Sequence, residues 1–281
     1  MQILFNTIMI EPNKWSDDKT PQRPLAELLP ALSDAGFDSL EIWQYHASSL
    51  DTRGISHLAS ILREHAQTAV GLGAYPFLHL EGPEGDEATN RLGRLIAYAA
   101  SIGVSIFKVF PGRVPSARAD KAIWARSILQ LRGIAQQLAE RNMILTLETH
   151  GNTLCDTEES TLRILAELEG LGNIGICFQP YTDQDTDAAI AFYTTLAPHV
   201  RHIHLQNRSS AAGGSCCLLA EGDWLDYTRL LPAIKNSGYD GPLSLEFTAN
   251  MPTPQDGASD LSNTLDNALK DRSFVLETWD R

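Results

Sequence analysis

The sequence alternates eight times between a short apolar run and a longer amphipathic run, and this alternation restricts the fold more than any other feature. The apolar runs have the length of buried strands, and the amphipathic runs space their apolar residues as helices do. Strands are predicted over residues 2–8, 38–43, 69–75, 104–110, 143–149, 173–179, 201–207 and 242–248. Helices are predicted over residues 24–36, 56–67, 88–103, 121–142, 159–170, 187–198, 226–238 and 261–279.

Eight strand–helix units in one chain of 281 residues predict an α/β fold, namely a single-domain (β/α)8 TIM barrel over residues 1–281. A doubly wound open sheet is the alternative, but it normally carries a glycine-rich phosphate-binding turn after its first strand. The segment NTIMIEPNKW at that place has no such turn. Gly36, Gly103 and Gly238 end three of the predicted helices just before the next strand, as glycine often does.

The bulk composition bears on the class of ligand. A net charge of −13 argues against binding to nucleic acid or to anionic membranes, and it favours a small neutral or weakly charged ligand. The four cysteines have no zinc-type spacing, and no run is long enough to span a membrane. The N-terminal residues lack the basic and apolar regions of a secretory signal, so we predict a soluble cytoplasmic protein.

Polar residues stand at the carboxyl ends of several predicted strands, where TIM barrels form their active sites. Because side chains alternate along a strand, Glu148 and His150 share one face. A helix cap or a salt bridge would explain any one of these residues. Several buried polar side chains at neighbouring strand ends each need an interaction partner, and a shared metal ion would serve all of them. The set suits Mn²⁺, Co²⁺, Mg²⁺ or Zn²⁺ as that partner. Its other members are Glu41, Gln179, His204, Gln206 and Glu246.

Five motifs together resemble the xylose-isomerase-like TIM-barrel superfamily. They are GFDSLEIW, LTLETHG, CFQPY, HIHLQN and GYDGPLSLEF, and they follow one another in the order found in that superfamily. The resemblance extends over nearly the whole chain. The superfamily contains sugar epimerases and isomerases, inosose dehydratases, dehydroshikimate dehydratases and class II AP endonucleases. The resemblance therefore implies the fold strongly and the substrate only weakly.

The resemblance also implies a set of metal ligands. Sugar epimerases of this superfamily hold their metal with Glu, Asp, His and Glu on strands five to eight. The matching residues here are Glu148, Gln179, His204 and Glu246. Gln179 departs from the pattern and removes one negative charge, which leaves two alternatives: a site that binds metal more weakly, or a site in which Gln179 is not a ligand. Thr182 stands where the epimerases often have a substrate-binding histidine.

The activity implied by the resemblance is that of a divalent-metal-dependent isomerase or epimerase, acting on a keto-sugar or cyclitol through an enediolate. Glu148 and Glu246 are the implied acid/base pair, and His150 could relay a proton or hold a hydroxyl. Lys108 either points into the barrel or reaches solvent, and aromatic residues near the strand ends either face the sugar or pack in the core. The predicted substrate-binding residues are Glu41, Trp43, Lys108, Tyr181 and Arg208.

Three alternatives remain at this stage. The same site could eliminate a leaving group and act as a dehydratase or lyase. An AP endonuclease is disfavoured by the net charge of −13. A non-catalytic sugar-binding barrel stays open because of Gln179. Barrels of this superfamily often form dimers, so the resemblance also allows a homodimer.

Overall fold

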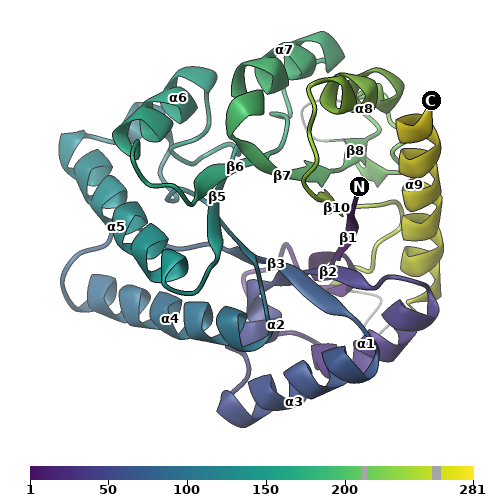
Figure 1. Cartoon of the computed structure of the whole chain (residues 1–281), viewed down its shortest axis with the longest axis horizontal. Coiled ribbons are helices and arrows are strands. Elements are labelled where there is room, and N and C mark those ends of the chain that lie inside the picture. The colour runs from purple at the N-terminus through teal and green to yellow at the C-terminus, as the bar shows by residue number, and fades with distance from the viewer. Residues whose placement is uncertain (211–213, 255–260) are drawn as a thin grey trace.

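Eight parallel strands close into a barrel surrounded by helices in the computed structural model, which describes residues 1–210, 214–254 and 261–281 (Figure 1). The predicted (β/α)8 barrel is therefore confirmed. The order around the barrel is β1-β10-β7-β6-β5-β4-β3-β2, and pairing of Ile3 with Leu243 joins the last strand to the first. The barrel strands are β1 (Ile3–Asn6), β2 (Ser39–Trp43), β3 (Thr68–Ala74), β4 (Ile106–Val109), β5 (Ile144–Glu148), β6 (Ile174–Phe178), β7 (Val200–Leu205) and β10 (Leu243–Leu245).

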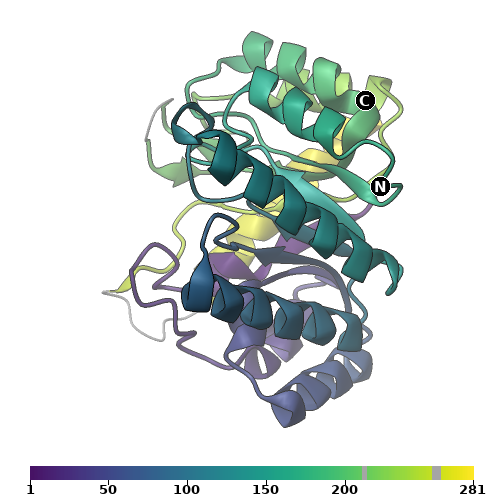
Figure 2. The same ribbon diagram turned by 90° about the vertical axis from the view of Figure 1, so that its left-hand side faces the viewer.

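Helices connect the strands along the outside of the barrel, as the two views show (Figures 1 and 2). Several begin at a side chain that accepts a backbone N–H, as Asp120 does from Ile123 at the start of α5. Gly36, Gly103 and Gly238 follow helices with φ of 75°, 82° and 81°, the left-handed conformation that glycine adopts without strain. The larger helices are α1 (Leu25–Asp34), α3 (Thr52–Glu64), α4 (Gly82–Ser101), α5 (Lys121–Ala139), α6 (Glu158–Glu167), α7 (Thr186–Leu196), α8 (Tyr227–Asn236) and α9 (Ser262–Asp280).

Short elements that periodicity did not predict lie in the loops. A strand pair formed by β8 (Asn207–Arg208) and β9 (Cys216–Cys217) follows β7, so the predicted strand over 201–207 is divided. Two to five residues are too few to establish a period, which is why the sequence did not reveal these elements. The others are α2 (Gln44–Ser48) and the 3-10 turns η1 (Thr7–Ile10), η2 (Ser116–Arg118) and η3 (Ala197–His199).

The barrel interior is apolar at one end and polar at the other. Leu4, Val70 and Ile106 form a small buried cluster of their own, near the amino ends of β1, β3 and β4. Lys108 lies two residues beyond Ile106 on the same face of β4 and begins the polar half of the interior. The fold thus gathers buried polar groups at the carboxyl end. None of the helices in the described part of the chain is long and apolar enough to cross a membrane.

Candidate active site and metal centre

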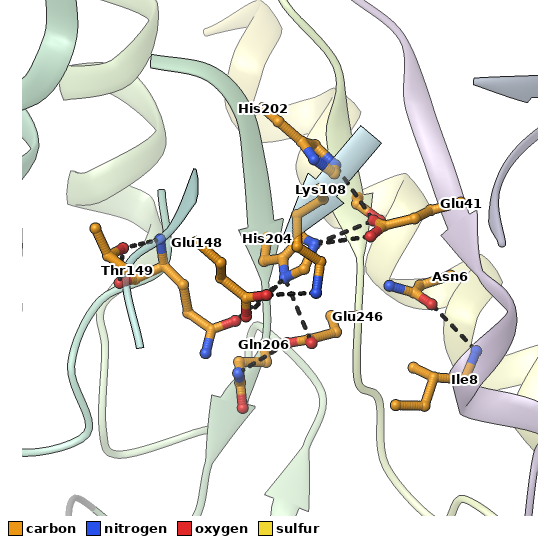
Figure 3. A network of polar contacts seen from close by, with 12 residues as sticks. Asn6, Ile8, Glu41, Lys108, Glu148, Thr149, His202, His204, Gln206 and Glu246 are labelled. Carbon is orange, nitrogen blue, oxygen red and sulfur yellow. Dashed lines mark hydrogen bonds and ion pairs between the residues drawn. The ribbon is translucent and has the colours of Figure 1, made fainter. Parts of the chain in front are cut away.

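Glu148 of β5, His204 of β7 and Glu246, the residue after β10, converge at the carboxyl end of the barrel (Figure 3). Gln179, the residue after β6, is the fourth member of this group. His204 Nδ1 lies 3.5 Å from Glu148 Oε1 and 3.4 Å from Glu246 Oε1. The side-chain oxygen of Gln179 lies 3.2 Å from the same nitrogen. Each of the four residues is at most 5% exposed. The structure therefore brings together all four residues predicted as metal ligands.

These donors fit a divalent cation. Glu148, His204 and Glu246 offer ligand atoms that lie within 4.8 Å of one another. Ligands that share an ion with bonds of about 2.1 Å are themselves separated by roughly 3 Å, close to the spacing found here. Buried carboxylates this near to each other need positive charge beside them, and Lys108 supplies part of it at Glu148. An oxygen-rich set with one imidazole suits Mn²⁺, Mg²⁺, Co²⁺ or Zn²⁺.

The amide of Gln179 has two orientations with different consequences. With its oxygen toward His204 it presents a neutral ligand atom to the site. With its nitrogen inward it donates to Glu246 Oε2 over 2.8 Å and to Glu148 Oε1 over 3.2 Å. The first orientation belongs to a metal ligand, and the second holds the two carboxylates in place by hydrogen bonds. Both alternatives raised by the sequence thus have a geometric basis.

Glu41 lies one layer beneath the four converging side chains. Its Oε2 is 3.0 Å from His204 Nε2 and accepts the Ser244 hydroxyl over 2.6 Å. Glu41 is fully buried, so it positions the imidazole and does not border the cavity above, where a substrate-binding residue was expected. Burial opposes its ionisation, but the facing imidazoles of His204 and His202 outweigh burial and hold the pKa of Glu41 well below its usual range.

Lys108 points into the barrel and forms an ion pair with Glu148, with both side chains 1% exposed. Its ammonium also lies 4.6 Å from the centre of the Tyr75 ring. Burial opposes the charge on Glu148, but Lys108 and then His204 outweigh it and lower the pKa of Glu148 to about 2. Lys108 therefore keeps Glu148 ionised, and it contacts a metal-ligand candidate, not the cavity.

Cys177 and His202 form a further group that the sequence did not predict as functional. The ligand atoms of Cys177, His202 and His204 lie within 4.8 Å of one another. Burial lowers the pKa of His202, but Cys177 and Glu41 outweigh burial and raise that pKa to about 9. Strand pairing sets Cys177 beside His202, and this cross-strand contact between residues far apart in sequence left no local signal.

A cavity of about 240 Å³ opens above the four converging side chains. His150 borders it and stacks on Phe110 with ring centres 4.5 Å apart. Trp43 and Arg208, two of the expected substrate-binding residues, border it. Tyr181 does not, because it stacks on Phe192 and its hydroxyl donates to the Cys155 carbonyl. Several further residues line the cavity that the sequence did not predict. Lys14, Trp15, Lys19 and Arg113 lie in loops without a strand or helix pattern, and Phe247 lies beyond the end of β10, inside the predicted strand over 242–248.

The chain belongs to the xylose isomerase-like TIM barrel family, whose model matches residues 29–268. A 3-dehydroshikimate dehydratase from Bacillus anthracis is 26% identical over 180 residues, which are 63% of this chain and 64% of that protein, so the match spans slightly less than two thirds of the relative.

Solved structures share the fold at lower identity. A D-allulose 3-epimerase from Methylomonas sp. in complex with D-allulose has a TM-score of 0.74 at 16% identity, covering 99% of this chain and 97% of that one. A xylose isomerase-like TIM barrel protein from Mycobacterium smegmatis in complex with magnesium has a TM-score of 0.71 at 15% identity, covering 99% and 96%. At these identities the similarity demonstrates a common fold.

Proposed function

We propose that the chain is a divalent-metal-dependent isomerase or epimerase that acts on a keto-sugar or cyclitol. The observation that carries this proposal is the convergence of Glu148, Gln179, His204 and Glu246 beneath a cavity of about 240 Å³. A pocket near this size, with a few polar groups at its floor, suits a small polyhydroxylated molecule. The structural similarity to an epimerase that binds D-allulose and to a magnesium-containing family member supports the same proposal.

The four converging side chains would hold the ion, and a bound divalent ion supplies Lewis-acid polarisation of a substrate carbonyl. Glu246 borders the cavity and is the group best situated to remove the proton on the carbon beside that carbonyl. The Gln206 amide donates to Glu246 Oε2 over 3.0 Å and fixes the orientation of the carboxylate. Glu41 in turn fixes the ring of His204 from below.

Glu148 is less suited to act as a general acid or base than the family resemblance implied. Its pairing with Lys108, and a pKa near 2, keep it ionised across the physiological range. We therefore assign Glu148 to metal binding alone. The second acid/base group of an isomerase or epimerase is then His150, which borders the cavity and is held against Phe110.

A dehydratase or lyase is the second candidate, and two observations favour it. In an elimination Glu246 would remove the proton, and the same proton, returned from Glu246 or supplied by His150, would leave with the hydroxyl as water, so one carboxylate at the cavity is enough. The curated relative with 26% identity is a 3-dehydroshikimate dehydratase. Both candidates share proton removal beside a carbonyl, and they differ in whether a hydroxyl then leaves.

Solvent exchange tests the proposal. The Mn²⁺-loaded protein is incubated in D₂O with keto-sugars, keto-cyclitols and 3-dehydroshikimate, and products are followed by NMR. For an isomerase or epimerase we expect deuterium beside the carbonyl with all hydroxyls retained. For a dehydratase we expect the proton beside the carbonyl and a neighbouring hydroxyl to leave together as water, with formation of a double bond. Glu246→Gln should slow exchange by on the order of 10³-fold without changing Tm. Binding of a substrate without exchange would instead support the non-catalytic alternative.

A further inference from the structure

The cavity above the candidate metal site is lined by an excess of basic side chains. Four of them border it, namely Lys14, Lys19, Arg113 and Arg208. Glu246 is the only carboxylate among the described residues that line the cavity. The chain as a whole has 35 acidic and 22 basic residues, so the local sign of charge is opposite to the overall sign.

Arg208 lies on the side of the cavity next to Glu246. Its Nη2 donates to the Gln206 side-chain oxygen over 3.2 Å, and its Nη1 donates to the Gly214 carbonyl over 3.3 Å. Both acceptors are uncharged, so they leave the guanidinium charge uncompensated. Arg208 Nε is buried and has no hydrogen-bond partner in the described ranges. A guanidinium with only neutral hydrogen-bond acceptors around it suits an oxyanion that accepts two parallel hydrogen bonds.

Lys14 adds a buried charge near the partly buried Arg208. It is 3% exposed, and its ammonium donates to the carbonyls of Glu11 and Pro252 over 2.8 Å each. Both cations act on the Cys216 thiol: burial raises its pKa, Arg208 opposes the rise, Glu246 and Cys217 add to it, and Lys14 opposes it. Arg208 and Lys14 therefore lie near the same wall as the Glu246 carboxylate.

The loops after β1 and β4 contribute the other two cations. Lys19 is partly buried, and burial followed by repulsion from Arg113 lowers its pKa, with Asp17 opposing the shift. The Arg113 guanidinium lies 4.9 Å from the centre of the Phe77 ring. Like charges crowded at one opening cost free energy that a bound anion would recover.

We propose that the substrate of this site carries an oxyanion, either a carboxylate or a phosphate, which Arg208 binds on the Glu246 side of the cavity. Lys14, Lys19 and Arg113 attract the anion and Gln206 connects its binding residue to the catalytic carboxylate. This inference rests on the proposed function for the location of the chemistry. It replaces the neutral ligand expected from the net charge with an anionic one.

Titration calorimetry of the Mn²⁺-loaded protein tests the inference with three probes: D-fructose, D-fructose 6-phosphate and D-gluconate. Heats from titrating each probe into Mn²⁺ alone are subtracted. We expect at least one anionic probe to bind about tenfold or more tightly than fructose, and the difference to shrink between about 50 mM and about 300 mM NaCl. The tighter of the two anions identifies the source of the oxyanion.

Two variants assign the effect to the cavity. Arg208→Gln should abolish the anion preference, whereas Arg94→Gln, an exposed change on α4, should retain it. The double variant Lys19→Gln/Arg113→Gln changes loop residues that are at least partly exposed, and it should weaken the preference for the anionic probes. It keeps the test available if Arg208→Gln does not fold. Equal affinity for all three probes, or an anion preference that survives both the Arg208 and the double variant, would overturn the inference.

The exchange assay separates this inference from the proposed function. If neutral keto-sugars exchange their proton and anions bind no better than fructose, the anion site is wrong and the enzymatic proposal stands. If anions bind through Arg208 and no carbonyl compound exchanges a proton or loses a hydroxyl, the anion site stands and the enzymatic proposal is wrong.

Discussion

Gln179 is the residue on which the strength of the candidate metal site depends most. It supplies a neutral amide where the sugar epimerases that the sequence resembles have a carboxylate. Its oxygen lies 3.2 Å from His204 Nδ1, within the ligand set formed by Glu148 and Glu246. Two carboxylates suffice to balance a divalent ion, but the Glu148 charge is shared with Lys108. The site as built is short of negative charge.

Gln179→Asp should therefore tighten Mn²⁺ binding by about tenfold or more, because it restores one negative charge at close range. Calorimetric titration of chelator-treated protein measures the change. Gln136→Glu adds the same charge at an exposed position of α5 and should leave the affinity unchanged. If Gln179→Asp has no more effect than this control, Gln179 does not contact the metal.

Lys108→Met tests the ion pair with Glu148. The change leaves a buried carboxylate without its cation, and we expect the free energy of unfolding to fall by about 3 kcal/mol in metal-free protein. Saturating Mn²⁺ should recover more stability in Lys108→Met than in the wild type, because the ion replaces the lost positive charge. Urea unfolding with and without Mn²⁺ measures both values. An equal loss in both conditions would mean that the ion does not contact Glu148.

Sequence patterns located the candidate site but did not resolve its layers. Alternation along a strand identifies which face a residue occupies, so Glu148 and His204 were predicted at the barrel mouth. It does not say how far below the barrel mouth a side chain lies. Glu41 was therefore expected at the substrate, whereas it contacts His204 from below. Tyr181 follows β6 in a loop, where no period applies, and its contact with Phe192 left no local signal.

At the scale of elements, α9 is joined to the barrel by a buried acid. Asp271 is 1% exposed and accepts hydrogen bonds from the Leu219 backbone over 2.7 Å and from the Thr248 hydroxyl over 2.6 Å. These contacts connect the last helix to the segment after β9 and to the segment after β10, which also carries Glu246. The predicted helix over 261–279 matches α9 closely, whereas this tertiary contact was beyond what helical spacing can reveal.

Asp271 should make stability depend on pH. Burial raises its pKa from 3.8 to about 6, against the two hydrogen bonds that favour the ionised form. Because the folded-state pKa lies above the unfolded value, its contribution is fully present below about pH 4 and is lost as the pH rises through 6.

The difference in unfolding free energy between wild type and Asp271→Asn isolates this contribution, since other groups titrate in both proteins. We expect the wild type to lose about 3 kcal/mol relative to the variant between about pH 4 and about pH 7. Urea unfolding at several pH values measures the difference. A difference that does not vary with pH would show that Asp271 titrates normally in the folded protein.

At the scale of the whole molecule, eight repeats of one strand–helix pattern were enough to predict the barrel, because few other folds accommodate that many units. The net charge was less informative about the class of ligand. The overall value of −13 describes the average surface, while the loops after β1, β4 and β7 bring Lys14, Lys19, Arg113 and Arg208 to one opening. Binding residues are commonly found in loops, which are also where sequence patterns are weakest.

The stoichiometry of metal binding tests the candidate metal site most directly. Chelator-treated protein is titrated with Mn²⁺ and free ion is followed by electron paramagnetic resonance, with circular dichroism confirming the fold of each variant. We expect one saturable ion per chain in the wild type and none in Glu148→Ala or His204→Ala. Absence of saturable binding in the folded wild type, or a site that survives both substitutions, would contradict this expectation.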